Sequence, residues 1–450
     1  MTAFKRESIA WLECILAERF GYQFTIHQDE QMIWLQLQRA VGWIGFDIRL
    51  PAFHRSRSDF PCGEWDAITE GWKPALGQPV PTPGLASPPQ PLINSVGGNT
   101  LIHYDILGLT YWMLSRLEEV GRADLDEHNR FPATSSHAFQ NGYLERPIVD
   151  EWLDILGQVM CWQWPGIELR KHQFQMKISH DVDNPSRYGF QSITGLIRSV
   201  AGDALKRRDF RSAIFAPWLW LSARRRLHPR DPFNTFDWLM DQSDAHNLIS
   251  AFYFICGRTE PTRDARYDPE QPALRALMRR IHKRGHEVGL HPSYNTFQTP
   301  KQIRFEADRL RHVCAEEGIE QTSWGGRMHF LRWEHPTTLR AWDEAGMDYD
   351  STLGYADRLG FRCGTCYEYP AFDPVTQEQL CLRVRPLIAM ECTIMADRYM
   401  GFGKSEATRQ KLAQMKDRCR AFEGCFTLLW HNSQLTDSRE RQIYLDILAA

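Results

Sequence analysis

The first third of the chain mixes helical and strand-like spacings of apolar residues. Apolar residues recurring every three to four positions predict helices over residues 2–20, 103–120 and 147–160. Alternation of apolar and polar residues predicts strands over 32–37 and 43–50. The proline-rich stretch 74–94 is interpreted as a long surface loop. We place a domain boundary near Leu169 and interpret residues 1–169 as an α+β accessory domain.

From residue 174 onward, short apolar runs alternate with helical patterns. The runs predict parallel strands or strand ends within 175–183, 248–256, 286–291, 323–330, 348–352, 387–395 and 425–433. Helical crossovers are predicted between them, as at 268–285 and at 299–318, where Gly318 supplies a C-terminal stop. About seven such units would close on themselves, so the predicted fold class is α/β, with a distorted (β/α) barrel over residues 170–450.

Composition is typical of a globular protein of two domains. Hydrophobic residues make up 43% and charged residues 24% of the 450 positions. No run approaches the roughly 18 apolar residues of a membrane span, and no signal peptide is recognised, so we expect no transmembrane segment. Eleven irregularly spaced cysteines suit reduced thiols, and the expected compartment is cytoplasmic.

Charge does not point to nucleic acid as a partner, because the formal net charge is -3. Two short runs, 206–208 and 224–226, are locally basic. They are either solvated helix faces or contacts for phosphate groups on a nucleotide- or lipid-linked substrate.

Polar residues follow the first predicted strand of the barrel, in the motif HDVDN. His180, Asp181 and Asp183 emerge together, with the two aspartates on one side if the strand persists. One carboxylate could bind a cation while the other accepts a proton from water. Alternatively, the pair caps the following helix.

Three further clusters occupy other strand ends, where a parallel barrel displays its active site. GHEVGLHPSYNT places His291 at a strand end and Asn295 just beyond it, both as candidate metal ligands. GGRMHFLRW carries Arg327, which could orient Asp181, and His329, a ligand, a substrate donor or a structural histidine. LLWHNS ends in His431, either a general acid or a structural histidine.

The four motifs, in this order and spacing, resemble those of the polysaccharide deacetylase superfamily, the NodB-homology carbohydrate esterases, from about residue 174 to the C-terminus. The resemblance implies that Asp181 is the base, Asp183 and His291 bind metal, Arg327 braces the base and His431 is the general acid. Asn295 stands where the family has a second histidine ligand, so His329 is our candidate to complete the shell. The implied cofactor is a divalent cation, with Zn²⁺ favoured and Mn²⁺, Co²⁺, Ni²⁺ or Fe²⁺ as alternatives.

The resemblance also bears on the substrate. The backbone N–H of Phe330 matches the family's oxyanion donor. Asp350 and Asp357 are offered in place of the acid that orients the general-acid histidine. Trp333, Arg332, Arg362 and Asp350 are further candidates for substrate binding, although core packing is the alternative for Trp333.

Segments such as EHNRFPATSSHAF and YLERPIVDEWLDIL look like a long bacterial subgroup with an added N-terminal domain, similar to proteins of surface-polysaccharide and lipopolysaccharide assembly. The sequence therefore predicts a hydrolase that removes an acetyl or formyl group from an amino sugar, free, nucleotide-linked, lipid-linked or polymeric. Two alternatives stay open: an amidase of the same fold acting on a small cyclic amide, and a catalytically silent sugar-binding scaffold.

Overall fold

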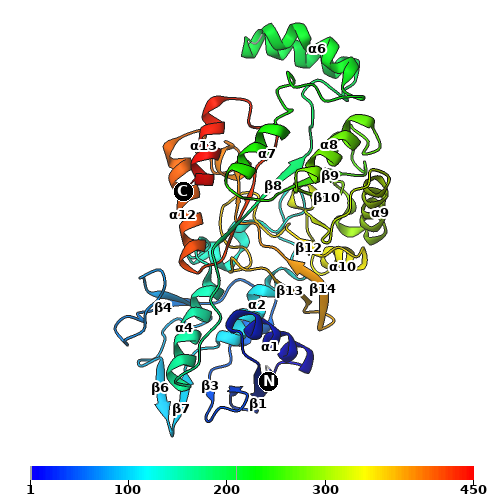
Figure 1. Ribbon diagram of the computed structural model, residues 1–450. Coiled ribbons are helices and arrows are strands. Elements are labelled where there is room, and N and C mark those ends of the chain that lie inside the picture. The colour runs from blue at the N-terminus through cyan, green and yellow to red at the C-terminus, as the bar shows by residue number, and fades with distance from the viewer. Residues whose placement is uncertain (1–2, 209, 450) are drawn as a thin grey trace.

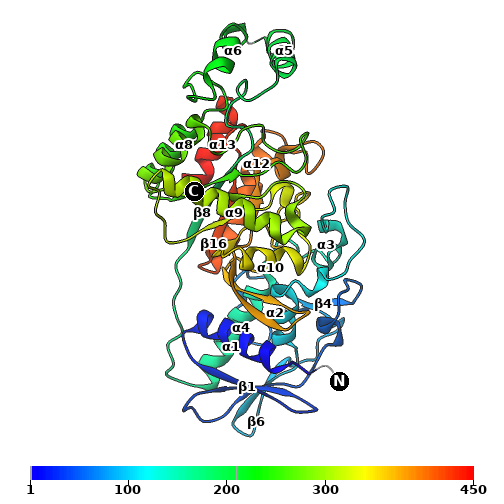
Figure 2. The same cartoon turned by 90° about the vertical axis from the view of Figure 1, so that its right-hand side faces the viewer.

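The computed structural model describes residues 3–208 and 210–449. An N-terminal part (blue to cyan) lies at one end, a large sheet with its covering helices lies in the middle, and helices α5 and α6 project at the opposite end (Figures 1 and 2). The mixed α/β class predicted from the sequence is confirmed. The predicted site motifs all belong to the middle part, which therefore positions the site.

The N-terminal part contains a five-stranded sheet of order β1-β2-β3-β7-β6 and a two-stranded ribbon of β4 and β5. Its elements are α1 (Arg6–Phe20), β1 (Phe24–Gln28), β2 (Ile33–Leu37), β3 (Ile44–Phe46), β4 (Cys62–Trp65), β5 (Val80–Pro83), β6 (Ile93–Val96), β7 (Asn99–Ile102), α2 (Ile106–Leu114), α3 (His137–Gln140) and α4 (Ile148–Gln163), with 3₁₀ turns at Pro51–His54, Leu117–Glu119 and Ala133–Ser135.

Helix α1 illustrates how the apolar spacing sets an element. Trp11, Leu12 and Leu16 recur at helical spacing and are buried, so one face of the helix packs on the core. Gly21 ends the helix in the left-handed region with φ 81°, and its N–H donates to Ala17 O. The helix predicted over 2–20 is therefore confirmed from Arg6, while Thr2 lies outside the described residues.

The prediction of one long surface loop over 74–94 is wrong. Residues 80–83 form β5, which is buried along its whole length and pairs antiparallel with β4, and β6 begins at Ile93. Pro81 and Pro83 are tolerated there because each strand of a two-stranded ribbon is an edge strand, where a missing N–H can face away from the ladder.

The middle part is built on a nine-stranded sheet of order β13-β14-β12-β11-β10-β9-β8-β16-β15. All neighbours pair in parallel except the antiparallel hairpin of β13 and β14. The strands are β8 (Gln175–Val182), β9 (Ser250–Ile255), β10 (Glu287–His291), β11 (Gly325–Gly326), β12 (Tyr349–Asp350), β13 (Tyr369–Asp373), β14 (Glu378–Val384), β15 (Ala389–Met390) and β16 (Cys425–Leu429).

Helices cover this sheet, with α8, α9 and α10 on one side and α12 and α13 on the other (Figure 1). The crossover helices predicted at 268–285 and 299–318 are confirmed as α8 and α9. The bounds are α5 (Ile193–Gly202), a π segment at Asp203–Arg207, α6 (Phe210–Ser222), α7 (Phe236–Ala245), α8 (Pro272–Lys283), α9 (Pro300–Glu316), α10 (Thr337–Glu344), α11 (Glu391–Met395), α12 (Glu406–Ala421) and α13 (Ser438–Ala449), with 3₁₀ turns at Thr296–Gln298 and His329–Leu331.

One continuous segment, residues 378–390, borders both ends of the parallel strand series. Its first half, β14, pairs with β12, and its last residues, β15, pair with β16. Between them, Arg385 N donates to Asp350 O, and Leu387 N donates to Leu353 O. Backbone hydrogen bonds therefore connect β12 to β16 through this segment.

Strand β8 shows why polar side chains arrive together at one place. Its exposed start, Gln175, gives way to a buried end, and side chains alternate between two faces. Ser179 and Asp181 both accept hydrogen bonds from Arg327, whereas His180 points the other way and its ring lies 4.8 Å from that of Phe252. Asp181 therefore faces the carboxyl ends of the neighbouring strands.

A buried ion network joins the N-terminal part to the middle part. Glu119 accepts hydrogen bonds from Arg116 at 2.8 Å and from Arg362 Nε at 2.9 Å, and all three side chains are almost fully buried. Burial alone would raise the pKa of Glu119, but Arg362 and Arg116 lower it to about 2. The network ties a residue of the N-terminal part to the chain that follows β12.

We expect Glu119→Gln to destabilise the fold by about 3–5 kcal/mol near pH 7, because two buried guanidinium groups lose their shared counter-charge. Since the folded pKa is below the ordinary value of 4.5, this contribution is present above that value and is lost as the pH falls toward 2. Denaturant unfolding across this range measures it. Asp124→Asn is the matched control, since it breaks an exposed pair with Arg122 and should cost about 1 kcal/mol or less. If both variants lost the same free energy of unfolding, the buried network of Glu119 would not stabilise the fold more than an exposed ion pair does.

Candidate metal centre and active-site pocket

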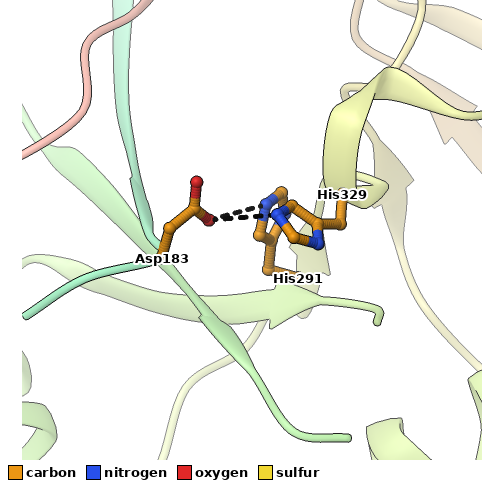
Figure 3. Close-up of side chains that lie close together, drawn as sticks. All are labelled: Asp183, His291 and His329. Atoms are coloured by element: carbon orange, nitrogen blue, oxygen red, sulfur yellow. Dashed lines mark ion pairs between the residues drawn. The ribbon is translucent and has the colours of Figure 1, made fainter. Parts of the chain in front are cut away.

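Three side chains from three different strand ends converge on one point (Figure 3). Asp183 follows β8, His291 ends β10 and His329 begins the turn after β11. Asp183 Oδ1 lies 3.3 Å from His291 Nε2 and 3.7 Å from His329 Nε2. The cluster therefore joins two residues predicted as ligands to His329, the predicted replacement for the missing histidine.

Each histidine is held by a hydrogen bond at its far nitrogen. His291 Nδ1 lies 2.6 Å from the carbonyl oxygen of Arg327, which can only accept, so Nδ1 carries the hydrogen. His329 Nδ1 lies 3.1 Å from Asp264 Oδ1, and Asp264 is itself fixed by the backbone N–H of Tyr294 at 2.7 Å. In the neutral rings, both Nε2 lone pairs therefore face the carboxylate of Asp183.

This convergence of acceptors fits a divalent cation. Asp183 Oδ1 is buried and accepts no hydrogen bond from any described residue. Two ligand atoms held tetrahedrally at about 2.0–2.1 Å from Zn²⁺ lie about 3.4 Å apart, which is close to the separations observed. Although burial opposes it, positive charge on protonated His329, His291 and His431 lowers the pKa of Asp183 below its usual range, and a bound cation would supply positive charge at the same place when the rings are neutral. Asp183, His291 and His329 would hold the cation.

Asp181 lies beside this cluster and is fixed by an arginine. Arg327 Nη1 donates to Asp181 Oδ1 at 2.8 Å, and both side chains are buried. Arg327 is in turn held by Ser179 Oγ at 2.9 Å and by Ser351 O at 2.9 Å. The other oxygen, Asp181 Oδ2, lies 3.7 Å from His291 Nε2. The arginine thus holds one carboxylate oxygen of Asp181 and leaves the other facing the cluster.

His431 approaches the cluster from the end of β16. Its Nε2 lies 3.7 Å from Asp183 Oδ2, and its Nδ1 lies 2.5 Å from Glu391 Oε1. Burial lowers and Glu391 raises the pKa of His431, and the carboxylate outweighs burial. Asp350 and Asp357 do not orient this histidine: Asp350 accepts from Thr352, and Asp357 accepts from Ala133 N.

Sequence reasoning missed Glu391 and Asp264. Glu391 comes directly after β15, so it obeys the strand-end rule that indicates the other acidic residues, but the apolar run 387–395 continues past it and does not show where the strand ends. Asp264 lies in an irregular segment after β9, where no pattern singles it out. A second group of potential ligands, Glu391, Cys392 and His431, is less suited to a metal because Glu391 and His431 already bind each other.

The cluster of Asp183, His291 and His329 borders a pocket of about 220 Å³, together with Asp181 and His431. Arg130 reaches it from the N-terminal part and donates to Phe330 O at 2.8 Å. Phe330 has φ 60°, a conformation that L-residues rarely adopt, and it turns the chain at the pocket wall. The lining comprises Arg130, Asp181, Asp183, Asn184, His291, His329, Phe330, Leu331, Met390, Cys392, Arg398, Tyr399, Leu429, His431, Ser433 and Gln434.

Arg327 holds Asp181 from outside the pocket lining, and five other predicted site residues also lie outside it. Asn295 is directed away from the cluster, because its Oδ1 accepts from Arg332 and its Nδ2 donates to Thr259 O. Arg332 is buried between His128 O and Tyr294 O. The other three are buried in structural contacts: Arg362 with Glu119, Trp333 stacked on His335, and Asp350 with Thr352. We therefore drop all five from the proposed site.

Comparisons with known proteins give weak likenesses. A family described as a family of unknown function (DUF7033) matches residues 10–165. No curated protein matches the chain. Solved structures that resemble 64% of this chain include a Mycobacterium smegmatis protein named as a polysaccharide deacetylase (15% identity, 85% of its chain, TM-score 0.38), the Puue allantoinase (12%, 85%, 0.36) and a Pseudomonas aeruginosa PAO1 protein named as a polysaccharide deacetylase (15%, 86%, 0.36). At these TM-scores, the function has to be argued from the site geometry.

We expect His329→Ala to lower the affinity for Zn²⁺ by about tenfold or more, because one of three converging ligands is lost. Asn295→Ala is the matched control and should bind Zn²⁺ like the unchanged protein, since its side chain is directed at Arg332. Competition with a chromogenic chelator measures both affinities. If Asn295→Ala weakened Zn²⁺ binding and His329→Ala did not, Asn295 and not His329 would be the third ligand.

Proposed function

We propose that this protein is a metal-dependent hydrolase that removes an acetyl or formyl group from the nitrogen of an amino sugar. The observation that carries the proposal is the convergence of Asp183, His291 and His329 beside a fixed carboxylate, Asp181, and a fixed histidine, His431. A cation site flanked by one base and one acid is the arrangement that amide hydrolysis requires.

We infer that residues 1–169 form an accessory domain and residues 170–450 a distorted (β/α) barrel. The segment 378–390, which borders both β12 and β16, supports closure of the strands. The carboxyl ends of parallel strands then share one mouth, as the strand-end positions of Asp183, His291 and His431 require. The accessory domain is proposed to hold the site in place. Glu119 binds the buried Arg362, and Arg130 reaches the pocket and donates to Phe330 O.

Asp181 is the proposed base. Arg327 fixes one of its oxygens, so the other can accept a proton from the attacking water without a change of rotamer. When bound, a divalent cation would supply Lewis acidity to the acyl carbonyl and the water. The backbone N–H of Phe330, at the pocket wall, is the proposed donor to the developing oxyanion.

His431 is the proposed acid. Its Nδ1 is bound to Glu391, which stabilises the protonated ring and directs Nε2 toward Asp183 and the pocket. From Nε2 it would protonate the amine as the carbon–nitrogen bond breaks, and the free amino sugar would leave with acetate or formate as the second product.

The pocket also suits a small acyl group. Leu331, Met390 and Leu429 form an apolar patch in its wall, opposite in character to the charged cluster. A methyl group or hydrogen on the acyl carbon would meet this patch.

On the motif resemblance, we place the reaction in bacterial surface-polysaccharide or lipopolysaccharide biosynthesis. An amine-detecting panel of N-acyl amino sugars and small cyclic amides separates this reaction from cyclic-amide hydrolysis.

We expect Asp181→Asn to lower turnover of the best substrate in that panel by about 10²-fold or more and to leave bound Zn²⁺ unchanged, because the amide cannot take the proton. Amine release and metal content are measured on the same preparation. Asp308→Asn, at an exposed position of α9, is the matched control and should retain both. Full turnover in the Asp181 variant would remove this residue as the base.

Glu391→Gln should lower kcat and shift the alkaline limb of the kcat/KM profile to lower pH. The reason is that the carboxylate raises the pKa of His431, and the acid must be protonated to act. The rate profile and the metal content are compared with those of the unchanged protein. An unshifted alkaline limb, with metal retained, would show that Glu391 does not tune the acid.

A further inference from the structure

Helices α5 and α6 belong to a lobe, residues 193–230, that exposes an unusual amount of apolar surface. Of the eighteen large hydrophobic side chains exposed in the described chain, eight lie between residues 193 and 221, so exposure is concentrated here. They are Ile193, Ile197, Leu205, Phe210, Ile214, Phe215, Trp218 and Leu221. Exposed apolar side chains concentrated in one part of a folded protein are typical of an interaction site.

Six of the eight exposed side chains lie on one face of α5 or of α6. In α6, Phe210, Ile214, Trp218 and Leu221 are spaced at four, four and three residues, and Trp218 is 50% exposed. The opposite faces already have a core of their own, formed by Tyr188, Leu196, Ala216 and Leu219. The exposed side chains of the outer face therefore do not contribute to the hydrophobic core of the lobe.

The position of the lobe leaves this face free of the rest of the chain. Helices α5 and α6 project beyond the middle part, at the end opposite α1 and β1 (Figure 2). The lobe is inserted between β8 and α7, and its base is fastened where Arg187 N and Phe233 N donate to Asp231. It begins in the connection that also carries Asp183.

The charge of the lobe is opposite to that of the whole protein. Residues 193–230 contain nine lysines and arginines and two aspartates, a formal net charge of +7, whereas the whole chain carries -3. Of the described side chains, Arg198, Arg208, Arg224, Arg225 and Arg226 are exposed. None of these five forms an ion pair with a described residue, whereas Asp203 is buried against Arg187. The apolar face is thus flanked by arginines that have no ion-pair partner among the residues the structure describes.

We propose that this lobe docks the protein on the surface of an anionic lipid bilayer, with α5 and α6 lying in the interface. An apolar helix face bordered by arginines is the chemistry of an interfacial helix: apolar side chains enter the acyl boundary and guanidinium groups meet lipid phosphates. A tryptophan such as Trp218 is favoured at this depth.

The helices lie on the bilayer and do not cross it. At about 1.5 Å per residue, the 13 residues of α6 extend about 20 Å, less than the hydrocarbon core of about 30 Å. Across the described residues, no helix meets the length and hydropathy that a membrane span needs.

Two other occupants fit the lobe less well. A second copy of the chain would bring two lobes of charge +7 together, which opposes association through this face. Nucleic acid would meet the arginines but would leave most of the eight apolar side chains without a partner. Lipid satisfies both features at once, and the proposal does not depend on the proposed hydrolase activity.

The test is flotation of the full chain with phosphatidylglycerol-containing vesicles and with pure phosphatidylcholine vesicles. We expect binding to the anionic vesicles and about tenfold or more weaker binding to the neutral ones. Ile214→Asp with Trp218→Asp, and separately Arg224→Gln with Arg225→Gln and Arg226→Gln, should each lower binding to anionic vesicles by about tenfold or more. The two sets test the apolar and cationic contributions independently.

Matched controls carry the same changes elsewhere. Val41→Asp with Val375→Asp alters exposed apolar residues, and Arg279→Gln with Arg280→Gln and Lys283→Gln removes three charges from α8. Both should bind vesicles like the unchanged protein, and circular dichroism checks that every variant is folded. The proposal is overturned if the unchanged protein does not float, or if folded lobe variants float equally well. Self-association or nucleic-acid binding through the lobe, without vesicle binding, would also overturn it.

Discussion

The structure of the site depends on the convergence of hydrogen-bond acceptors around Asp183. His291 must donate its Nδ1 hydrogen to the carbonyl of Arg327, and His329 directs Nδ1 to the carboxylate of Asp264. In their neutral forms, both rings therefore present lone pairs to a carboxylate oxygen that accepts no hydrogen bond from the part of the chain that the structure describes. Burying three acceptor atoms so close together costs free energy unless a positive charge lies between them. A divalent cation would satisfy all three acceptors at once, beside the proposed base, Asp181, and the proposed acid, His431.

Rigid contacts behind the site maintain this convergence. Arg327 links Asp181 to Ser179 and Ser351, so β8 and the segment after β12 fix the proposed base together. Glu391 fixes His431 in the same way from the end of β15. The N-terminal part adds the buried pair of Glu119 and Arg362 and brings Arg130 to the pocket. Residues far from the proposed metal ligands thus help to fix the side chains of the site.

Much of this arrangement could be predicted from the sequence, because apolar runs followed by polar residues mark the ends of buried parallel strands. That rule indicates Asp181, Asp183, His291 and His431. His329 became a candidate because Asn295 stands where the resembled family has a second histidine ligand. The rule failed where side chains act through tertiary contacts that leave no periodic signal. Arg332 and Trp333 follow a motif closely yet turn into the core. The hairpin of β13 and β14, and β5 within a proline-rich stretch, likewise depend on partners distant in the chain.

The central claim is that one cation is shared by Asp183, His291 and His329. Anomalous diffraction at the zinc absorption edge, from crystals grown with stoichiometric Zn²⁺, tests it most directly. The account predicts a single strong peak about 2.0–2.2 Å from one oxygen of Asp183 and from both Nε2 atoms, with Asn295 uninvolved. A peak at Glu391, Cys392 and His431 instead, or no peak from metal-replete crystals, would contradict it.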